Sequence, residues 1–207
     1  MELELTGKNV LITGGSKGIG LAVAKGFAAE GCNLHLTSRT AEDLQAAKGI
    51  IEQAHDVKVQ IHPMDLAQPG AAENLRQAAG EVDILINNAG AIPGGDVLSV
   101  DEGRWREAWD LKVFGYINMT RLYLDAMTTR GDGIIINVTG TAGENPDPNY
   151  VAGSAGNASL MAFTRAIGST SIDSGVRVLA VNPGPVETDR ITALLKTWAE
   201  AEFGDRE

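Results

Sequence analysis

A glycine-rich turn at residues 13–20 is the clearest chemical signal in the chain. It reads Thr-Gly-Gly-Ser-Lys-Gly-Ile-Gly, follows a short apolar run and opens a segment with helical periodicity. Glycine at Gly14, Gly18 and Gly20 lets the backbone turn sharply, approach a ligand closely and pack a helix against a strand. The free N–H groups at the start of such a helix attract phosphate. An ordinary structural turn is the alternative, but the position between strand and helix favours a dinucleotide pyrophosphate site.

The segment 87–90, Asn-Asn-Ala-Gly, is a second candidate for ligand binding. It ends another apolar run. Ligands of parallel sheets lie beyond the carboxyl ends of the strands, so a residue group at that place can contact them. Small residues let a ribose or adenine pass close to the backbone, and asparagine side chains can hold the backbone of a loop. Taken alone, an ordinary turn explains this segment equally well.

The elements that must position these segments alternate regularly along the chain. Nearly continuous apolar runs such as 84–86 and 134–136 are typical of strands that helices cover on both faces. This alternation predicts an α/β fold of Rossmann type, a doubly wound parallel sheet in three α/β/α layers, with one domain over 1–207. The predicted strands are 9–13, 33–38, 57–62, 82–87, 133–139 and 176–182. The predicted helices are 18–30, 41–54, 70–79, 101–130 and 150–174.

Composition excludes several classes of function. The 207 residues carry a net charge of −10, spread along the chain, which disfavours a nucleic-acid partner. One cysteine, Cys32, cannot form an internal disulfide and fits a reducing, cytoplasmic setting. No stretch approaches the length of a membrane span, and residues 1–6 lack the features of a signal peptide. We therefore expect a cytoplasmic protein that binds a small molecule, with no membrane partner and no metal ion.

Together the two ligand segments resemble those of the short-chain dehydrogenase/reductases. The resemblance runs from the first strand to about Arg190. Asp65, with Leu66, fits the family's contact with adenine, and residues 182–186 with Thr188 fit the segment at the nicotinamide. The resemblance implies an NAD(P)-dependent oxidoreductase that acts on a carbonyl or alcohol group. The residues it assigns to the cofactor are Gly14, Ser16, Lys17, Gly18, Ile19, Gly20, Arg39, Asp65, Leu66, Asn87, Ala89, Gly90, Pro183, Gly184, Val186 and Thr188.

Two basic residues favour NADP(H) over NAD(H). The second predicted strand is followed by Arg39, where an NAD enzyme of this family would be expected to place an acidic residue, and Lys17 lies in the glycine turn. An arginine fork suits the dianionic 2′-phosphate geometrically. The alternative is that both cations are solvated surface groups.

The catalytic positions of the family depart from its pattern. Its reaction uses Ser, Tyr and Lys with a supporting Asn. The register of 164–166, Thr-Arg-Ala, places Asn157 at the Lys position and Gly153 at the Tyr position. Gly140 falls at the Ser position and Lys112 at the Asn position. Because glycine cannot transfer a proton, the chain is expected to be a divergent member that lacks the usual residues.

Other residues offer a replacement for the missing acid. Because burial beside a positive charge favours the neutral form of an amine, Lys112 is one candidate proton donor. Tyr150, which precedes Asn157 by seven residues on the predicted helix, is another. Thr139 or Thr141 can hydrogen-bond the substrate oxygen. Each candidate also has an interpretation without a role in catalysis. Lys112 would be an exposed surface residue, Tyr150 would only start the helix, and the two threonines would cap backbone groups.

A different class of function is a dinucleotide-binding pseudoenzyme, which serves as a sensor or scaffold subunit without ordinary turnover. Losing one acid–base group typically costs about 10²–10⁴-fold in rate, so slow turnover is compatible with a degenerate site.

The last two predicted helical segments, 150–174 and 187–207, give expectations about subunit assembly and about substrate binding. Small residues such as Gly153 and Gly156 predict close approach of a ligand or of another subunit, and the family implies a homo-dimer or homo-tetramer. Residues 187–207 resemble only the substrate-lid segment of the family. They place Leu194, Leu195 and Trp198 on one helical face. The family's final strand is not evident, which predicts an open sheet edge.

Overall fold

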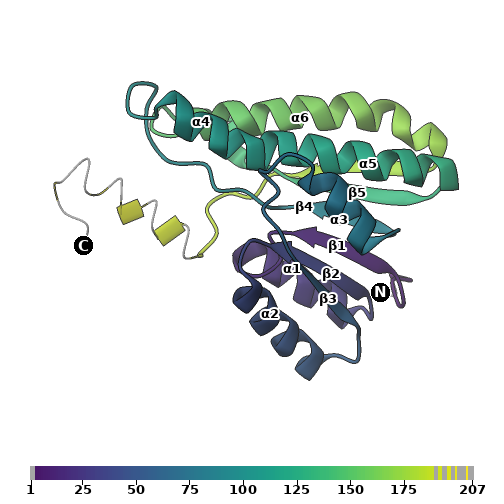
Figure 1. The fold of residues 1–207 in the computed structure, drawn as a ribbon. Helices are drawn as coiled ribbons and strands as arrows, with labels where there is room; N and C mark the ends of the chain where they lie inside the picture. The colour runs from purple at the N-terminus through teal and green to yellow at the C-terminus, as the bar shows by residue number, and fades with distance from the viewer. Residues whose placement is uncertain (1–2, 189–190, 193–194, 197–198, 200–203, 205–207) are drawn as a thin grey trace.

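The computed structural model describes residues 3–188, 191–192, 195–196, 199 and 204. Six parallel strands form one sheet in the order β3-β2-β1-β4-β5-β6 (Figure 1). Because the chain winds outward from β1 in one direction and from β4 in the other, the predicted doubly wound Rossmann-type sheet is confirmed. The strands are β1 (Asn9–Thr13), β2 (Asn33–Ser38), β3 (Val59–Pro63), β4 (Ile84–Asn87), β5 (Gly133–Val138) and β6 (Val176–Val181).

Helices cover both faces of the sheet and give three layers (Figure 1). The helices are α1 (Gly18–Ala29), α2 (Ala41–Ala54), α3 (Ala71–Ala79), α4 (Glu102–Trp109), α5 (Gly115–Arg130) and α6 (Val151–Ser171). Alternate residues of one strand point to opposite faces of the sheet: Ile12 packs in the core with α1 and α2, whereas Leu11 packs in the core with α3 and α5.

The predicted single helix over 101–130 is wrong in its middle. Between α4 and α5 lies a π-helical turn, η1 (Asp110–Phe114), that carries Lys112. A π-helical turn changes the direction of its side chains relative to the flanking helix and is frequent at functional sites. The helix predicted over 150–174 also differs at both ends, since α6 begins at Val151 and a 3₁₀ turn, η3 (Ile172–Ser174), follows it.

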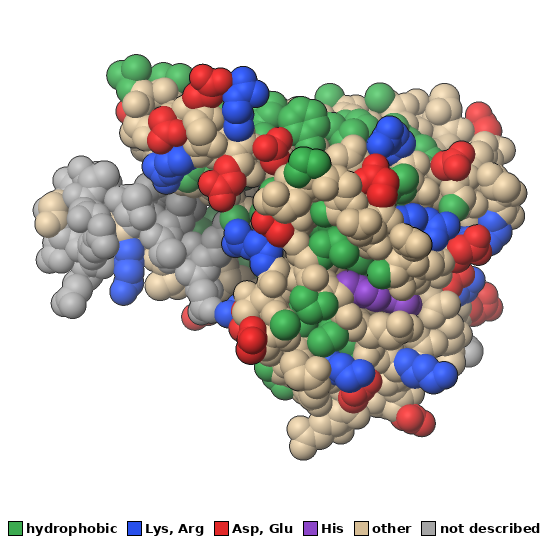
Figure 2. All heavy atoms as spheres, in the orientation of Figure 1, with side chains coloured by type: hydrophobic (Ala, Val, Ile, Leu, Met, Phe, Trp, Pro, Cys, Tyr) green, Lys and Arg blue, Asp and Glu red, His purple; other side chains and the backbone are tan. Residues whose placement is uncertain are grey.

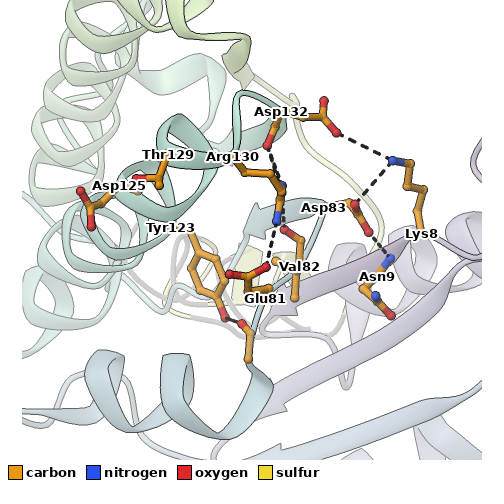
Figure 3. A network of polar contacts seen from close by, with 11 residues as sticks. Lys8, Asn9, Glu81, Val82, Asp83, Tyr123, Asp125, Thr129, Arg130 and Asp132 are labelled. Carbon is orange, nitrogen blue, oxygen red and sulfur yellow. Dashed lines mark hydrogen bonds and ion pairs between the residues drawn. The ribbon is translucent and has the colours of Figure 1, made fainter.

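The amino ends of the strands are closed by hydrogen bonds within the protein (Figure 3). One carboxylate oxygen of Asp83 accepts the Asn9 N–H at 2.8 Å, and the other lies 3.5 Å from Lys8 Nζ. Arg130 Nη2 donates to the Val82 carbonyl at 3.1 Å. These contacts join the starts of β1 and β4 to the end of α5.

The surface combines mixed charge with a partly apolar sheet edge. Acidic and basic side chains are interspersed over the face in Figure 2. In the described part of the chain β6 forms one edge of the sheet, and its Leu179 and Val181 are each 52% exposed. Among the same residues, no helix combines the length and apolar character that a membrane crossing requires. Of the predicted lid face, Leu195 is exposed, whereas Leu194 and Trp198 lie outside the described residues.

Candidate active site

Hydrogen bonds join the glycine turn to the loop after β4, at the carboxyl ends of the strands. Asn88 Nδ2 donates to the carbonyls of Thr13 and Gly14 at 3.0 and 3.1 Å. Thr13 Oγ1 accepts the N–H groups of Asn88 and Ala89 at 2.9 and 3.0 Å. The two segments that the sequence singled out therefore form one structure. Thr13 and Asn88 were not among the predicted site residues, although their place at strand ends was a usable signal.

The packing of the turn explains its glycines. Gly14 has φ +66°, and a Cβ there would lie 2.9 Å from Ala89 Cα. A Cβ on Gly20 would lie 2.1 Å from the Gly14 carbonyl oxygen. Helix α1 begins at Gly18, with no side-chain cap and no acidic residue in its first turn. The backbone N–H groups of its first turn are therefore available to an anion. A dinucleotide pyrophosphate requires such donors, together with a backbone that it can approach closely.

Three cavities that share lining residues follow the carboxyl ends of the strands. The first, of about 150 Å³, is lined by Arg39, Ser38 and Leu66. The second, of about 320 Å³, lies over the glycine turn and shares Gly14, Ala89 and Gly90 with the first. The third, of about 330 Å³, contains Tyr150 and shares Lys112, Thr139, Thr188, Ile19 and Pro183 with the second. Because each cavity shares residues with the next, the three form one elongated site along the carboxyl ends of the strands.

Most residues assigned to the cofactor line these cavities. They are Gly14, Lys17, Gly18, Ile19, Arg39, Leu66, Ala89, Gly90, Pro183, Gly184, Val186 and Thr188. Gly20 and Ser16 lie within the turn itself. The remaining two have structural bonds: the Asp65 carboxylate accepts the Ala67 N–H at 3.1 Å, and buried Asn87 donates to Thr120 and Asn137. Contacts of Asp65 and Asn87 with a cofactor stay predictions.

The two predicted phosphate-binding cations differ in their surroundings. Lys17 Nζ forms an ion pair with Asp43 at 2.9 Å, and the Lys17 side chain is largely exposed. Arg39 lines the first cavity and is exposed, and no ion pair joins it to another described residue. Beside it, Ser38 Oγ is buried without a hydrogen-bond partner among the described residues. Arg39 thus offers donors to an anionic ligand, whereas Lys17 must share its charge with Asp43.

Lys112 lies inside the site and is not a surface residue. It is 6% exposed, and Nζ donates to the carbonyls of Val138 and Thr139 at 3.2 and 3.4 Å. The π-helical turn directs this side chain toward the end of β5, where it lines the second and third cavities. The interpretation of Lys112 as an exposed helix residue is therefore wrong.

Tyr150 occupies the space beside Gly153. A Cβ on Gly153 would lie 2.0 Å from both Cε1 and Cζ of the Tyr150 ring, so the phenol lies directly over that glycine. Tyr150 itself precedes α6, with φ −143° and ψ 42°, and therefore does not share a helix face with Asn157 as predicted. Both side chains nevertheless line the third cavity. The tyrosine reaches the site by folding back over the first turn of α6.

The small residues of α6 receive side chains of this same chain. Gly153 is covered by Tyr150, and a Cβ on Gly156 would lie 3.3 Å from Trp109 Nε1 and 3.4 Å from Ile92 Cδ1. These two glycines therefore make room for side chains of the same chain, and not for a second subunit as predicted.

The two candidate threonines are not equivalent. Thr139 is buried, and its hydroxyl bonds Asn182 Oδ1, which ties the end of β5 to the loop after β6. Thr141 is exposed in the third cavity, and no hydrogen bond occupies its hydroxyl among the described residues. Thr141 is therefore the threonine with a donor available to a substrate.

Gly140 and Asn157 also meet in the third cavity. A Cβ on Gly140 would lie 3.0 Å from Asn157 Nδ2, so the amide fills the space beside that glycine. Asn157 is 3% exposed, and its Oδ1 has no hydrogen-bond partner in the described part of the chain. The sequence identified Asn157 only as a departure from a lysine.

Known proteins share this fold and sequence pattern. The family model described as short chain dehydrogenase matches residues 8–198. The chain is 30% identical over 196 residues to the 3-oxoacyl-[acyl-carrier-protein] reductase of Escherichia coli (strain K12), covering 93% of this chain and 79% of that protein. The L-sorbose reductase of Gluconobacter frateurii, solved with NADPH and L-sorbose, has a TM-score of 0.88 and 30% identity, and the match covers 100% of this chain and 80% of that one.

A third match agrees with these. A single-residue variant of actinorhodin polyketide ketoreductase, solved with NADPH, has a TM-score of 0.88 and 27% identity, over 95% of this chain and 77% of that one. The family model covers most of the sequence, and the bonded glycine turn lies within it. The chain belongs to the short-chain dehydrogenase family, whose members are NAD(P)-dependent oxidoreductases of carbonyl and alcohol groups.

Proposed function

We propose that this protein is an NADP(H)-dependent oxidoreductase that reduces a carbonyl or oxidises an alcohol at a non-standard catalytic site. The single observation that carries the proposal is the Tyr150 phenol, which lies over Gly153 in the third cavity. A phenol there supplies the proton that Gly153 itself cannot.

The residues of the first two cavities fit a dinucleotide. Gly14 and Gly18, with the uncapped start of α1, would hold the pyrophosphate, and Arg39 would hold the 2′-phosphate. Bound NADP(H) supplies or accepts the hydride. Neighbours of known structure that were solved with NADPH support the choice of cofactor. The ion pair of Lys17 with Asp43 makes Arg39 the main determinant of preference for the 2′-phosphate.

Tyr150 acts as the acid in reduction. Its hydroxyl donates a proton to the carbonyl oxygen while the carbonyl carbon takes up the hydride, so that an alcohol forms and a tyrosinate remains. The reverse reaction returns the proton to the tyrosinate. Solvent reaches the third cavity, because its wall includes exposed residues such as Thr141 and Asn145, and can reprotonate the phenol.

Lys112 and Thr141 support this step. Lys112 lines the same cavity as Tyr150. In its protonated form the amine would favour the anionic form of a phenol in that cavity. Its bonds to the Val138 and Thr139 carbonyls fix the end of β5. The Thr141 hydroxyl is the donor that would orient the substrate oxygen. In this scheme Lys112 is a positioning residue, and direct proton donation by Lys112 is the competing assignment.

Cofactor binding and turnover test the proposal together. We expect saturable quenching or enhancement of NADPH fluorescence, tighter binding of NADPH than of NADH, and oxidation of NADPH with at least one carbonyl compound of a broad panel. Tight NADPH binding with no turnover on the whole panel would support the pseudoenzyme instead. No NADPH binding would overturn both interpretations. The homo-dimer or homo-tetramer expected from the resemblance stays a prediction for light scattering.

A further inference from the structure

The Tyr150 ring is placed over Gly153 by a turn, residues 147–150, that precedes α6. The Tyr150 N–H donates to the Asp147 carbonyl at 3.0 Å, and the Tyr150 carbonyl accepts the Ser154 N–H at 2.8 Å. Within the turn, Asp147 Oδ1 accepts the Asn149 N–H at 2.8 Å. The position of the ring therefore depends on how the start of this turn, at Asp147, is held against the helix.

Ser154 joins the start of the turn to α6 through its side chain. Its hydroxyl oxygen accepts the Asp147 N–H at 3.0 Å, from a residue seven positions earlier in the chain. Hydroxyls farther along α6 bond differently, since those of Ser159 and Ser169 donate to carbonyls of their own helix three residues back. Ser154 is 6% exposed, so water does not readily replace its bond. The Ser154 side chain therefore bonds the turn and not its own helix.

A second segment holds the end of the same turn. The Gly95 N–H donates to the Asn149 carbonyl at 2.6 Å, and the Gly95 carbonyl accepts the Val151 N–H at 3.3 Å. These two bonds lie on either side of Tyr150 in the chain and form a parallel bridge. The end of the turn is thus fixed through the backbone at Gly95, whereas its start depends on the side chain of Ser154.

We propose that Ser154 is a positioning residue for the reaction, and that its bond to the Asp147 N–H holds the Tyr150 phenol over Gly153 in the third cavity. The proposal rests on the assignment of Tyr150 as the proton donor in the proposed function. Ser154 lines none of the three cavities, so it acts through Tyr150 and not on the substrate. Loss of the hydroxyl removes the bond at the start of the turn and lets the ring move. A reacting group displaced by about 1 Å loses much of its catalytic effect.

Turnover is the first arm of the test. Ser154→Ala should lower kcat about 10-fold, while KM and the affinity for NADPH stay near native, because the groups that contact substrate and cofactor are kept. Ser171→Ala, which changes a serine of similar burial at the far end of α6, is the matched control and should leave kcat unchanged. Native kcat in Ser154→Ala would overturn the proposal.

A double-mutant cycle separates positioning of the phenol from a general loss of structure. In a Tyr150→Phe background, adding Ser154→Ala should cause no further fall in kcat, because the hydroxyl through which Ser154 acts is already absent. A further fall of about 10-fold in that background would overturn the proposal, since Ser154 would then act independently of the phenol.

Fluorine NMR is the second arm and needs no turnover. With fluorotyrosine incorporated, the three tyrosines give three resonances, and Tyr150→Phe identifies the one from Tyr150. Tyr116 and Tyr123 are each 1% exposed and serve as internal references. Ser154→Ala should shift or broaden the Tyr150 resonance alone; an unchanged Tyr150 resonance, or equal changes in all three, would overturn the proposal. If Tyr150→Phe turns over at the native rate, the proposed proton donor fails separately, and the fluorine spectrum still decides whether Ser154 positions the ring.

Discussion

Replacing Gly153 by alanine probes the position of the Tyr150 phenol, the proposed proton donor, through a single methyl group. Within a helix, glycine to alanine normally stabilises by about 0.5–1 kcal/mol. At Gly153 the new Cβ would lie 2.0 Å from two carbons of the Tyr150 ring, where non-bonded carbons require about 3.5–4.0 Å. The ring must therefore move away from the buried cluster of Ile92, Ala108 and Ala152, against which it packs.

The magnitude follows from the surface that the ring gives up. If about 100 Å² of apolar surface returns to water at about 25 cal/mol per Å², the cost is roughly 2–3 kcal/mol. Offset by the gain in helix propensity, Gly153→Ala should lower the free energy of unfolding by about 1–2 kcal/mol. Turnover should fall about 10²–10⁴-fold, as for loss of a general acid, because the phenol no longer lies at the substrate.

Urea unfolding and NADPH oxidation on one substrate measure the two effects. Gly49→Ala in α2 is the matched control, since a Cβ there meets nothing within 4 Å, and it should stabilise slightly and leave turnover intact. In a Tyr150→Ala background the ring is gone, so adding Gly153→Ala should stabilise instead of destabilise. A Gly153→Ala protein that is more stable than the native one and equally active would refute the assigned position of the ring.

Three further predictions concern charge. Arg39→Ala should weaken NADPH binding about 10-fold and leave NADH binding nearly unchanged, because one charge-assisted contact to the 2′-phosphate is lost; equal effects on both would contradict its role. Lys112→Met should slow turnover at least about 10-fold while NADPH binding persists, and unchanged turnover would remove Lys112 from the site's chemistry. Burial, with the adjacent His62, lowers the pKa of His35 to about 4. Since the unfolded chain then binds one more proton between pH 6.5 and 4, stability present at pH 7 should fall as pH falls, by up to about 3 kcal/mol from His35. Urea unfolding at pH 7.5 and 4.5 checks this, and an equal loss in His35→Phe would contradict it.

The fold could be predicted closely because its signals are local. Residues 9–13, 33–38 and 41–54 form elements with the predicted bounds, since continuous apolar runs and helical periodicity report burial directly. The glycine turn was likewise recognisable because close backbone approach tolerates no other residue type. The π-helical turn at 110–114 was missed, because a single inserted residue leaves the helical pattern of the sequence nearly unchanged.

The chemistry of the site depends on contacts between distant segments, which composition does not reveal. Nothing in the local sequence shows that Tyr150 folds back over Gly153, or that Asp43 pairs with Lys17. The orphaned oxygens of Ser38 and Asn157 become visible only when all possible partners are placed in space. Sequence register predicts which catalytic residues of the family are replaced, and their replacement by Tyr150 and Lys112 stays a proposal.

Tyr150→Phe tests the central claim most directly, because it removes one oxygen and leaves the ring over Gly153. NADPH binding is measured by fluorescence and turnover by the loss of NADPH in the same preparation. We expect native affinity for NADPH together with a fall in turnover of about 10²–10⁴-fold. A Tyr150→Phe protein that binds NADPH and turns over at the native rate would contradict the assignment of the proton donor.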